Sequence, residues 1–313
     1  MPMASIALTL PVEPESWGLD PPQATKARVR TAANVFVIPL IAVHGNSAIT
    51  DGLAMGMFSQ FQRQMIFPGP EGVSPELLRR AADQVGATEL QIPTEDGETL
   101  YGWYRNAIQT GQRRVVLYFH GNASSVLAQI ELQNLLLTEG WDFVELHYRG
   151  YPGSSGSPSE AGLKKDALAA WRYATTELGA EPSHVAVHGR SLGGAVAAQL
   201  AATVDPGALV LESTFTSIVD LAKKHYWFLP MGRLLEHRFM TRDLAGELSC
   251  PILVAHGGAD SLIDVQHGRD LARLFHAEQY IEAPRLDHND VLFAGSFAAR
   301  YIQFLNDTVP AQP

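Results

Sequence analysis

From about Thr88 onward the sequence alternates between short β-rich runs and longer helical stretches, and this alternation constrains the fold more than any other feature. Such alternation is typical of a mostly parallel sheet with helices on both faces. Several runs are almost entirely apolar, as strands buried on both faces usually are. The eight expected strands are Glu89–Ile92, Thr99–Tyr104, Val115–Phe119, Phe143–Tyr148, Val185–His188, Leu209–Leu211, Ile252–Ala255 and Gln279–Ile281.

Helical patterns occupy the intervals between these strands. Asp96 and Gly97, in "TEDGETL", form a hairpin signal, so the first two strands are expected to be antiparallel. The segment 214–248 is rich in aromatic residues and too long for a simple connection, which indicates a small helical cap inserted in the domain. The expected helices are Val126–Thr138, Glu160–Leu178, Leu192–Thr203, Gln266–Phe275 and Val291–Leu305.

The chain divides by pattern into three parts. Residues 1–86 are interpreted as an N-terminal extension, residues 87–308 as the α/β domain, and residues 309–313 as a frayed tail. Within the extension, the apolar run 31–43 follows a basic stretch, but His44 and later polar residues interrupt it before the 20 or so residues that a membrane span needs. We expect a packed or interfacial helix within residues 31–58, and membrane association is not favoured.

Composition excludes several function classes. A net charge of -10 disfavours a nucleic-acid partner, because phosphate binding relies on clustered Lys and Arg. Cys250 is the only cysteine, so the chain can form neither an intramolecular disulfide nor a cysteine-based zinc site. Together with the lack of a secretory signal pattern at the N-terminus, this favours a reducing, cytoplasmic location. The oligomeric state cannot be inferred from the sequence.

The stretch "VAVHGRSLGGAVAAQL" contains a G-x-S-x-G pattern centred on Ser191. With 27 glycines in the chain such a pattern can arise by chance, and a serine before a helix can simply be its N-cap. The context is more specific, because a strand run ends at Gly189 and a small-residue helix pattern follows. Ser191 is therefore expected at a nucleophile elbow, the strained strand-to-helix turn that exposes a reactive hydroxyl.

A serine nucleophile needs a histidine base and a carboxylate that orients it. His288, in "LDHND", follows the last expected strand and is the expected base, whereas His256 and His120 lie beside glycines at strand ends and are interpreted as turn residues. Asp260, in the turn after the strand of "PILVAHGGAD", is the expected carboxylate. Glu212, at the end of "LVLE", is the alternative, since an acid there could reach the same imidazole.

Negative charge on an attacked carbonyl oxygen requires backbone N–H donors. The turn His120-Gly121-Asn122 follows the strand Val115–Phe119, and its Asn122 amide is expected to act with the Leu192 amide as an oxyanion hole. An ordinary turn with a capping Asn is the alternative.

These pieces together resemble the α/β-hydrolase superfamily of serine hydrolases, in its branch of abhydrolase-domain esterases and depalmitoylase-like enzymes. The matching stretches are "FHGNASS", "YRGYPGSSGSPSE", "HGRSLGG", "KKHYWFLP", "CPILVAHGGAD" and "DHND", in that order. The resemblance implies an eight-stranded α/β-hydrolase fold. It also implies Ser191 as nucleophile, His288 as base, Asp260 as its orienting acid, and the Asn122 and Leu192 amides as oxyanion donors.

The resulting hypothesis is an esterase or thioesterase that acts on a small-molecule acyl substrate without cofactor or metal. No metalloprotease or P-loop motif occurs in the sequence. Peptide cleavage and acyl transfer use the same machinery, and a non-catalytic binding protein with this fold is the alternative from another class. Aromatic cap residues are expected to line an acyl pocket, unless they form the core of the cap itself: Phe215, Tyr226, Trp227, Phe228 and Phe239.

Overall fold

The structure is a computed structural model, and it describes residues 59–60, 62–107, 113–225, 230–291 and 295–309. Residue contacts divide the chain into two units, Met1–Leu53 and Ala54–Pro313, and every described residue lies in the second unit. The apolar run at 31–43, and with it the expected helix within residues 31–58, lies outside the described residues, as do Tyr226, Trp227 and Phe228.

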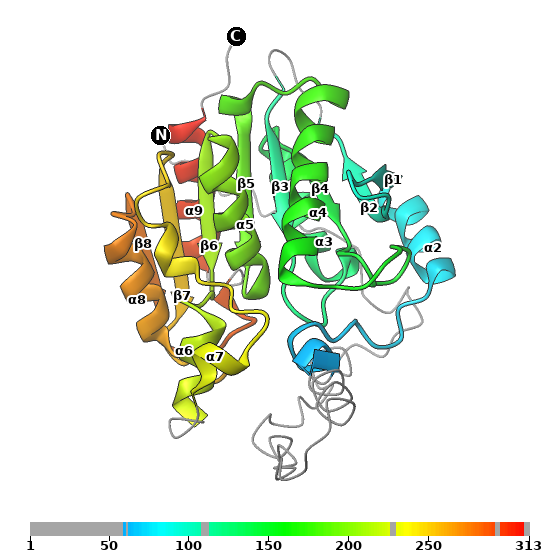
Figure 1. Ribbon diagram of the computed structural model, residues 1–313. Helices are drawn as coiled ribbons and strands as arrows, with labels where there is room; N and C mark the ends of the chain where they lie inside the picture. Colours follow the sequence, from blue (N-terminus) through cyan, green and yellow to red (C-terminus); the bar gives the residue numbers. More distant parts are fainter. Residues whose placement is uncertain (1–58, 61, 108–112, 226–229, 292–294, 310–313) are drawn as a thin grey trace, which may run out of the picture. The chain divides into compact units, whose positions relative to one another are not determined.

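An eight-stranded sheet forms the centre of the described unit, with the strand order β1-β2-β4-β3-β5-β6-β7-β8 (Figure 1). Strands β1 and β2, and β2 and β4, pair antiparallel, while the other neighbours pair parallel. The expected α/β fold and the antiparallel first hairpin are confirmed. The strands are β1 (Thr88–Pro93), β2 (Thr99–Arg105), β3 (Val115–Phe119), β4 (Asp142–Leu146), β5 (Val185–Arg190), β6 (Ala208–Glu212), β7 (Ile252–Gly257) and β8 (Gln279–Ala283).

Helices cover both faces of this sheet (Figure 1). Apolar residues of α4 (Glu160–Arg172), α5 (Leu192–Val204) and α8 (Val265–Leu274) form one core cluster with the sheet. Those of α3 (Ile130–Thr138) and α9 (Gly295–Thr308) form a second cluster with it. The sheet is therefore buried on both faces, which explains its apolar central strands.

The described unit starts before the α/β pattern of the sequence. Helix α2 (Pro75–Val85) begins at an N-cap, Ser74, whose side chain accepts a hydrogen bond from the Leu77 N–H at 3.2 Å. The helix ends at Gly86 in the left-handed conformation and packs on β1. Part of the segment interpreted as an extension therefore belongs to the same compact unit as the sheet.

Several helix ends differ from the sequence expectation. The expected helix 126–138 starts as a 3-10 turn at Val126–Gln129, and the expected helix 160–178 changes to a π-helical turn at Tyr173–Glu177. The last helix begins at Gly295 and ends at Thr308. The expected frayed tail was wrong for Val309, which is 1% exposed because its apolar side chain packs against Gly207. Residues 310–313 lie outside the described residues.

The expected cap contains three short helical segments, α6 (Ile218–His225), α7 (Met231–Leu234) and the 3-10 turn η6 (Thr241–Leu244). They lie between β6 and β7 in the chain, as the sequence pattern predicted. In Figure 1, α6 and α7 lie together beyond one end of the sheet, on the side where β6 leads into α6.

Candidate active site

Ser191 lies between β5, which ends at Arg190, and α5, which begins at Leu192. Its backbone has φ 55° and ψ −120°, outside the regions that residues with a side chain prefer. Such a conformation costs about 1–3 kcal/mol and persists only where its surroundings enforce it. The Ser191 N–H donates to the Glu212 carbonyl at 2.9 Å, and its own carbonyl accepts from the Thr214 hydroxyl at 2.7 Å. The strained turn is thus held by the neighbouring strand and the loop that follows it.

The glycines around Ser191 explain how the turn can be so tight. A Cβ at Gly193 would overlap the carbonyl of Phe119, and one at Gly189 would overlap the carbonyl of Gly193. Only glycine lets strand β5, helix α5 and the end of β3 approach this closely. The two glycines of the G-x-S-x-G pattern are therefore required by the packing of the elbow.

The alternative that Ser191 is an ordinary N-cap is not supported by its side chain. Ser191 occupies the N-cap position of α5, but its side chain forms no capping hydrogen bond. By contrast, Ser159 and Asp264 cap α4 and α8 with their side chains. Within the described part of the chain the Ser191 hydroxyl has no hydrogen-bond partner, and it stands at the positive end of the α5 dipole.

Asp260 and His288 come together from loops 28 residues apart, with His288 Nδ1 lying 2.7 Å from Asp260 Oδ2. The Asp260 side chain is fully buried and that of His288 is 7% exposed. The second oxygen of Asp260 accepts from the Leu262 and Ile263 amides at 2.9 and 2.8 Å. Burial favours the neutral acid, but hydrogen bonds from His256 and His288 outweigh it and hold the pKa of Asp260 well below its usual value. Asp260 is therefore ionised at neutral pH.

Glu212, the alternative carboxylate, is directed elsewhere. It is fully buried, and its Oε2 lies 3.2 Å from Nε2 of His188, one strand away in the sheet. The other ring nitrogen of His188 lies 3.1 Å from the Tyr301 hydroxyl. Among the described residues, His288 is hydrogen-bonded through its side chain to Asp260 and not to Glu212.

The turn after β3 lies directly against Ser191. A Cβ at Gly121 would be 3.2 Å from the Ser191 Cβ, so the lack of a side chain at Gly121 leaves the serine accessible. Asn122 and Leu192, the expected oxyanion donors, each directly follow one of these two residues. The turn is fixed by the Ala123 N–H, which donates to the Pro68 carbonyl at 3.1 Å.

His120 shapes this turn, as expected for a turn residue. Burial lowers its pKa to about 3, with His147 nearby also disfavouring protonation, so the ring is neutral. Its Nδ1 lies 2.8 Å from the Gly121 carbonyl, and its own carbonyl accepts from the Tyr148 hydroxyl at 2.8 Å. The rings of Tyr148 and Tyr151 pack on it, with centroids 4.3 and 5.2 Å away.

Comparison with known proteins identifies the family to which this arrangement belongs. Residues 114–238 match the model of a family described as the alpha/beta hydrolase fold. The uncharacterized protein Rv2307c of Mycobacterium tuberculosis is 34% identical to this chain over 256 residues, covering 81% of the chain and 88% of that protein. The chain belongs to the α/β-hydrolase family.

Other similar proteins in this family carry named activities. The lysophosphatidylserine lipase ABHD12 of Danio rerio is 32% identical over 189 residues, which cover 54% of this chain and 49% of that protein. The solved structure of the Pyrococcus furiosus esterase Pf2001 shares the fold, with a TM-score of 0.61 and 18% identity over 78% of this chain and 97% of that one. Membership of the family, with lipase and esterase relatives, indicates a hydrolase.

Sequence reasoning missed a set of polar groups beneath the elbow of this hydrolase. These polar residues interrupt otherwise apolar strand runs, and that interruption is the sequence signal by which they could have been found. In the sheet register Tyr118 lies beside both Glu145 and His188, and Arg190 lies beside Glu212. Glu145 is fully buried, and neither of its carboxyl oxygens has a hydrogen-bond partner in the described part of the chain.

The described aromatic cap residues are packed into the main core. Phe215 is 3% exposed and Phe239 is fully buried, and both belong to the cluster around α4 and α5. Phe239 also packs edge-on against Phe67, with ring centroids 6.0 Å apart. Phe215 and Phe239 therefore have a packing role, which the sequence analysis gave as the alternative to lining an acyl pocket.

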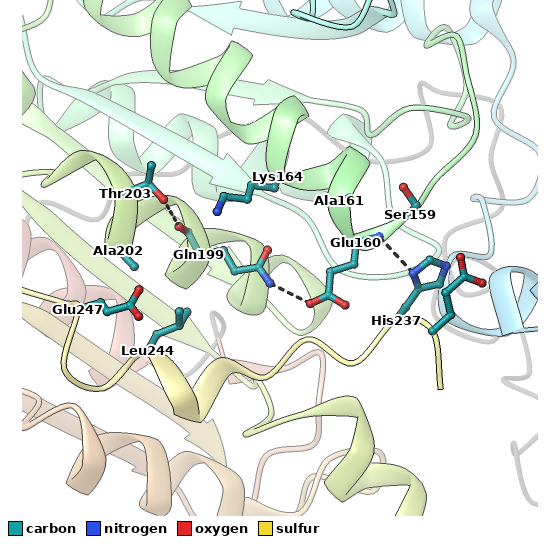
Figure 2. A pocket seen from close by; sticks show the side chains of 11 residues that line it. Ser159, Glu160, Ala161, Lys164, Gln199, Ala202, Thr203, His237, Leu244 and Glu247 are labelled. Atoms are coloured by element: carbon teal, nitrogen blue, oxygen red, sulfur yellow. Dashed lines mark hydrogen bonds between the residues drawn. The ribbon is translucent and has the colours of Figure 1, made fainter. Parts of the chain in front are cut away.

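A surface cleft of about 510 Å³ lies between α4, α5 and the cap, and Figure 2 shows its side chains. Gln199 and Thr203 line it from the second half of α5, whereas Ser191 stands at the start of that helix. At its centre the Glu160 carboxylate accepts hydrogen bonds from Gln199 and from the cap backbone. We interpret this cleft as the junction between cap and core.

Within the residues that the structure describes, no helix is both long enough and apolar enough to span a bilayer. In the same residues, no three His, Cys, Asp or Glu side chains are grouped so as to hold a metal ion.

Proposed function

We propose that this chain is a serine hydrolase that cleaves carboxylic esters or thioesters through an acyl-enzyme. The main supporting observation is the 2.7 Å contact between the buried side chains of Asp260 and His288. In addition, Ser191 lies at a strained elbow, and its hydroxyl does not cap helix α5. The chain order Ser191, Asp260, His288 is also the order that this fold uses. The roles follow from the chemistry of each group.

In the proposed first half-reaction, the Ser191 hydroxyl oxygen attacks the acyl carbonyl carbon while His288 Nε2 takes its proton. Asp260, bonded to Nδ1, fixes the tautomer that leaves Nε2 free to accept and stabilises the imidazolium that forms. When the tetrahedral intermediate collapses, the bond to the alcohol or thiol breaks. His288 then returns the proton to the leaving group, and the acyl group stays on Ser191.

The second half-reaction repeats this with water. His288 takes a proton from the water as its oxygen attacks the acyl carbon, and returns the proton to Ser191 as the acid leaves. In both halves the carbonyl oxygen becomes negative. We assign its stabilisation to the Asn122 and Leu192 amides, because Asn122 follows Gly121, which packs near Ser191, and Leu192 follows Ser191 itself.

Esters and thioesters are the favoured substrates for two reasons. One similar protein is named a lysophosphatidylserine lipase, and one protein of the same fold is named an esterase. An alcohol or thiol is also a better leaving group than an amine, so the same machinery should cleave esters and thioesters faster than amides.

The test measures hydrolysis of p-nitrophenyl acyl esters and acyl thioesters of graded chain length, together with labelling by a fluorophosphonate probe. Ser191→Ala is expected to lower kcat by at least about 10³-fold and to abolish labelling, with an unchanged melting temperature. Ser249→Ala is the matched control, because this serine is bonded to Asp205 away from the elbow. Turnover retained by Ser191→Ala, or a wild-type protein that neither turns over nor labels, would refute the proposal.

A further inference from the structure

Asp260 has a second histidine neighbour besides His288. Nε2 of His256, at the end of β7, lies 3.3 Å from Asp260 Oδ2, the same oxygen that His288 contacts. The same Nε2 lies 3.0 Å from the Ile263 carbonyl oxygen. The side chains of His256 and Asp260 are both fully buried, so water does not compete for these contacts.

The surroundings of His256 define where its hydrogen lies. Both neighbours of Nε2 are acceptors, a carboxylate and a carbonyl oxygen, so Nε2 must be the protonated nitrogen. Nδ1 is buried and has no hydrogen-bond partner within the described residues. Gly268 of α8 packs so closely against it that a Cβ there would lie 2.7 Å from Nδ1. His256 is therefore a fixed N–H group that is hydrogen-bonded to the Ile263 carbonyl and also lies beside Asp260 Oδ2.

We propose that His256 is a positioning residue for Asp260: its Nε2–H is held by the Ile263 carbonyl at 3.3 Å from Asp260 Oδ2, where it stabilises the carboxylate and weakens the field that Asp260 exerts on His288. The inference rests on the proposed function, in which His288 is the base. It assigns His256 an effect on the basicity of His288 in addition to the turn-shaping role that its position beside Gly257 suggests.

The direction of the effect follows from electrostatics. A hydrogen-bond donor stabilises the carboxylate and weakens the negative potential that Asp260 exerts on His288. Without it, the carboxylate charge acts more strongly on His288, whose protonated form becomes more stable. His288 would then lose its proton only at a higher pH. Asp260 would also be less rigidly held.

Other ionisable groups face this pair and stay the same in the test. Glu282 is the partner of His256 on β8, and it is bonded to Arg269 at 2.7 Å. His267 on α8 interacts with His256 electrostatically, and Asp287 does so with Asp260. Because none of these groups is altered in the variants, a change in the pH profile can be attributed to the loss of the His256 N–H.

The experiment records kcat/KM for a p-nitrophenyl ester from pH 5 to 9 in the wild type and three variants. His256→Leu removes the donor with little change in volume. His256→Gln keeps an N–H at the position of Nε2, since its amide nitrogen is equally far from Cβ along the side chain. His184→Leu is the control, because this histidine is also buried but precedes β5, at the end opposite the elbow.

We expect His256→Leu to lower kcat/KM about tenfold, the loss typical of a hydrogen bond to a charged group, and to move the acid limb of the profile to higher pH. His256→Gln should restore the limb to the wild-type position, and His184→Leu should not move it. An acid limb that stays fixed or moves to lower pH in folded His256→Leu overturns the inference. Failure of the proposed function is distinguishable, since then the wild type itself shows no Ser191-dependent turnover.

Discussion

Arg190, the residue before Ser191, donates a hydrogen bond from its guanidinium to the side chain of Asn289, the residue after His288, at 2.6 Å. The elbow and the histidine loop are 99 residues apart in the chain, and this contact joins them directly. Its partners each adjoin a residue of the proposed triad, so the bond can set the spacing between nucleophile and base.

Breaking this bond is expected to lower activity without unfolding the protein. Asn289→Ala removes the acceptor at an exposed position, and we expect kcat/KM to fall about three- to tenfold, which corresponds to a typical net hydrogen-bond contribution of about 0.7–1.4 kcal/mol. KM should change little, because the bond positions the catalytic groups and does not touch substrate. Steady-state kinetics with a p-nitrophenyl ester measures the effect.

A double-mutant cycle separates the bond from other roles of Arg190. Arg190→Lys keeps the positive charge beside Glu212 but loses the planar reach of the guanidinium. If the bond carries the effect, the double variant is no worse than the more damaging single variant. Additive losses, or wild-type kinetics in Asn289→Ala, would contradict this role.

The chain order of the strands and the approximate positions of Ser191, Asp260 and His288 were accessible from the sequence, because strand periodicity and turn glycines are local signals. The choice between Asp260 and Glu212 depended on where two loops fold in space. Only the structure shows Glu212 facing His188 within the sheet. The contact between His256 and Asp260 was also not predicted, although the two residues are only four apart in the chain, because it depends on the conformation of the turn between them. The burial of Val309 depends on Gly207, about a hundred residues away.

Glu160 links the cap to the core. Figure 2 shows its carboxylate bonded to Gln199 on α5, and its backbone N–H bonded to His237 of the cap. Its carboxylate accepts from the backbone N–H groups of Arg238 and Phe239 at 2.7 and 3.0 Å, and from Gln199 at 3.1 Å. Glu160→Ala leaves these donors unpaired, so we expect a loss of about 1–3 kcal/mol in the free energy of unfolding. Cleavage within residues 230–248 by a protease should become faster, as measured by limited proteolysis.

Glu247→Ala provides the matched control for this prediction. Glu247 lines the same cleft but is exposed on its rim, and its side chain forms no hydrogen bond within the described residues. We expect its stability and proteolysis to equal those of the wild type. Equal proteolysis rates for Glu160→Ala and Glu247→Ala would show that Glu160 does not hold the cap.

Glu145, buried in β4 with two unpartnered carboxyl oxygens, should make stability depend on pH. Burial raises its pKa well above the usual value, and nearby Arg190 only partly opposes this. A carboxyl whose pKa is higher in the folded state contributes stability below its unfolded pKa of about 4.3, and this contribution is lost as pH rises toward the folded pKa. The neutral Glu145→Gln variant has no such loss.

We therefore expect the free energy of unfolding of Glu145→Gln to lie within about 1 kcal/mol of the wild-type value at pH 5. The variant should become progressively more stable than wild type up to pH 8. Urea unfolding across this range measures the difference, with Glu131→Gln at an exposed position of α3 as the control. Parallel curves for Glu145→Gln and wild type would contradict the prediction.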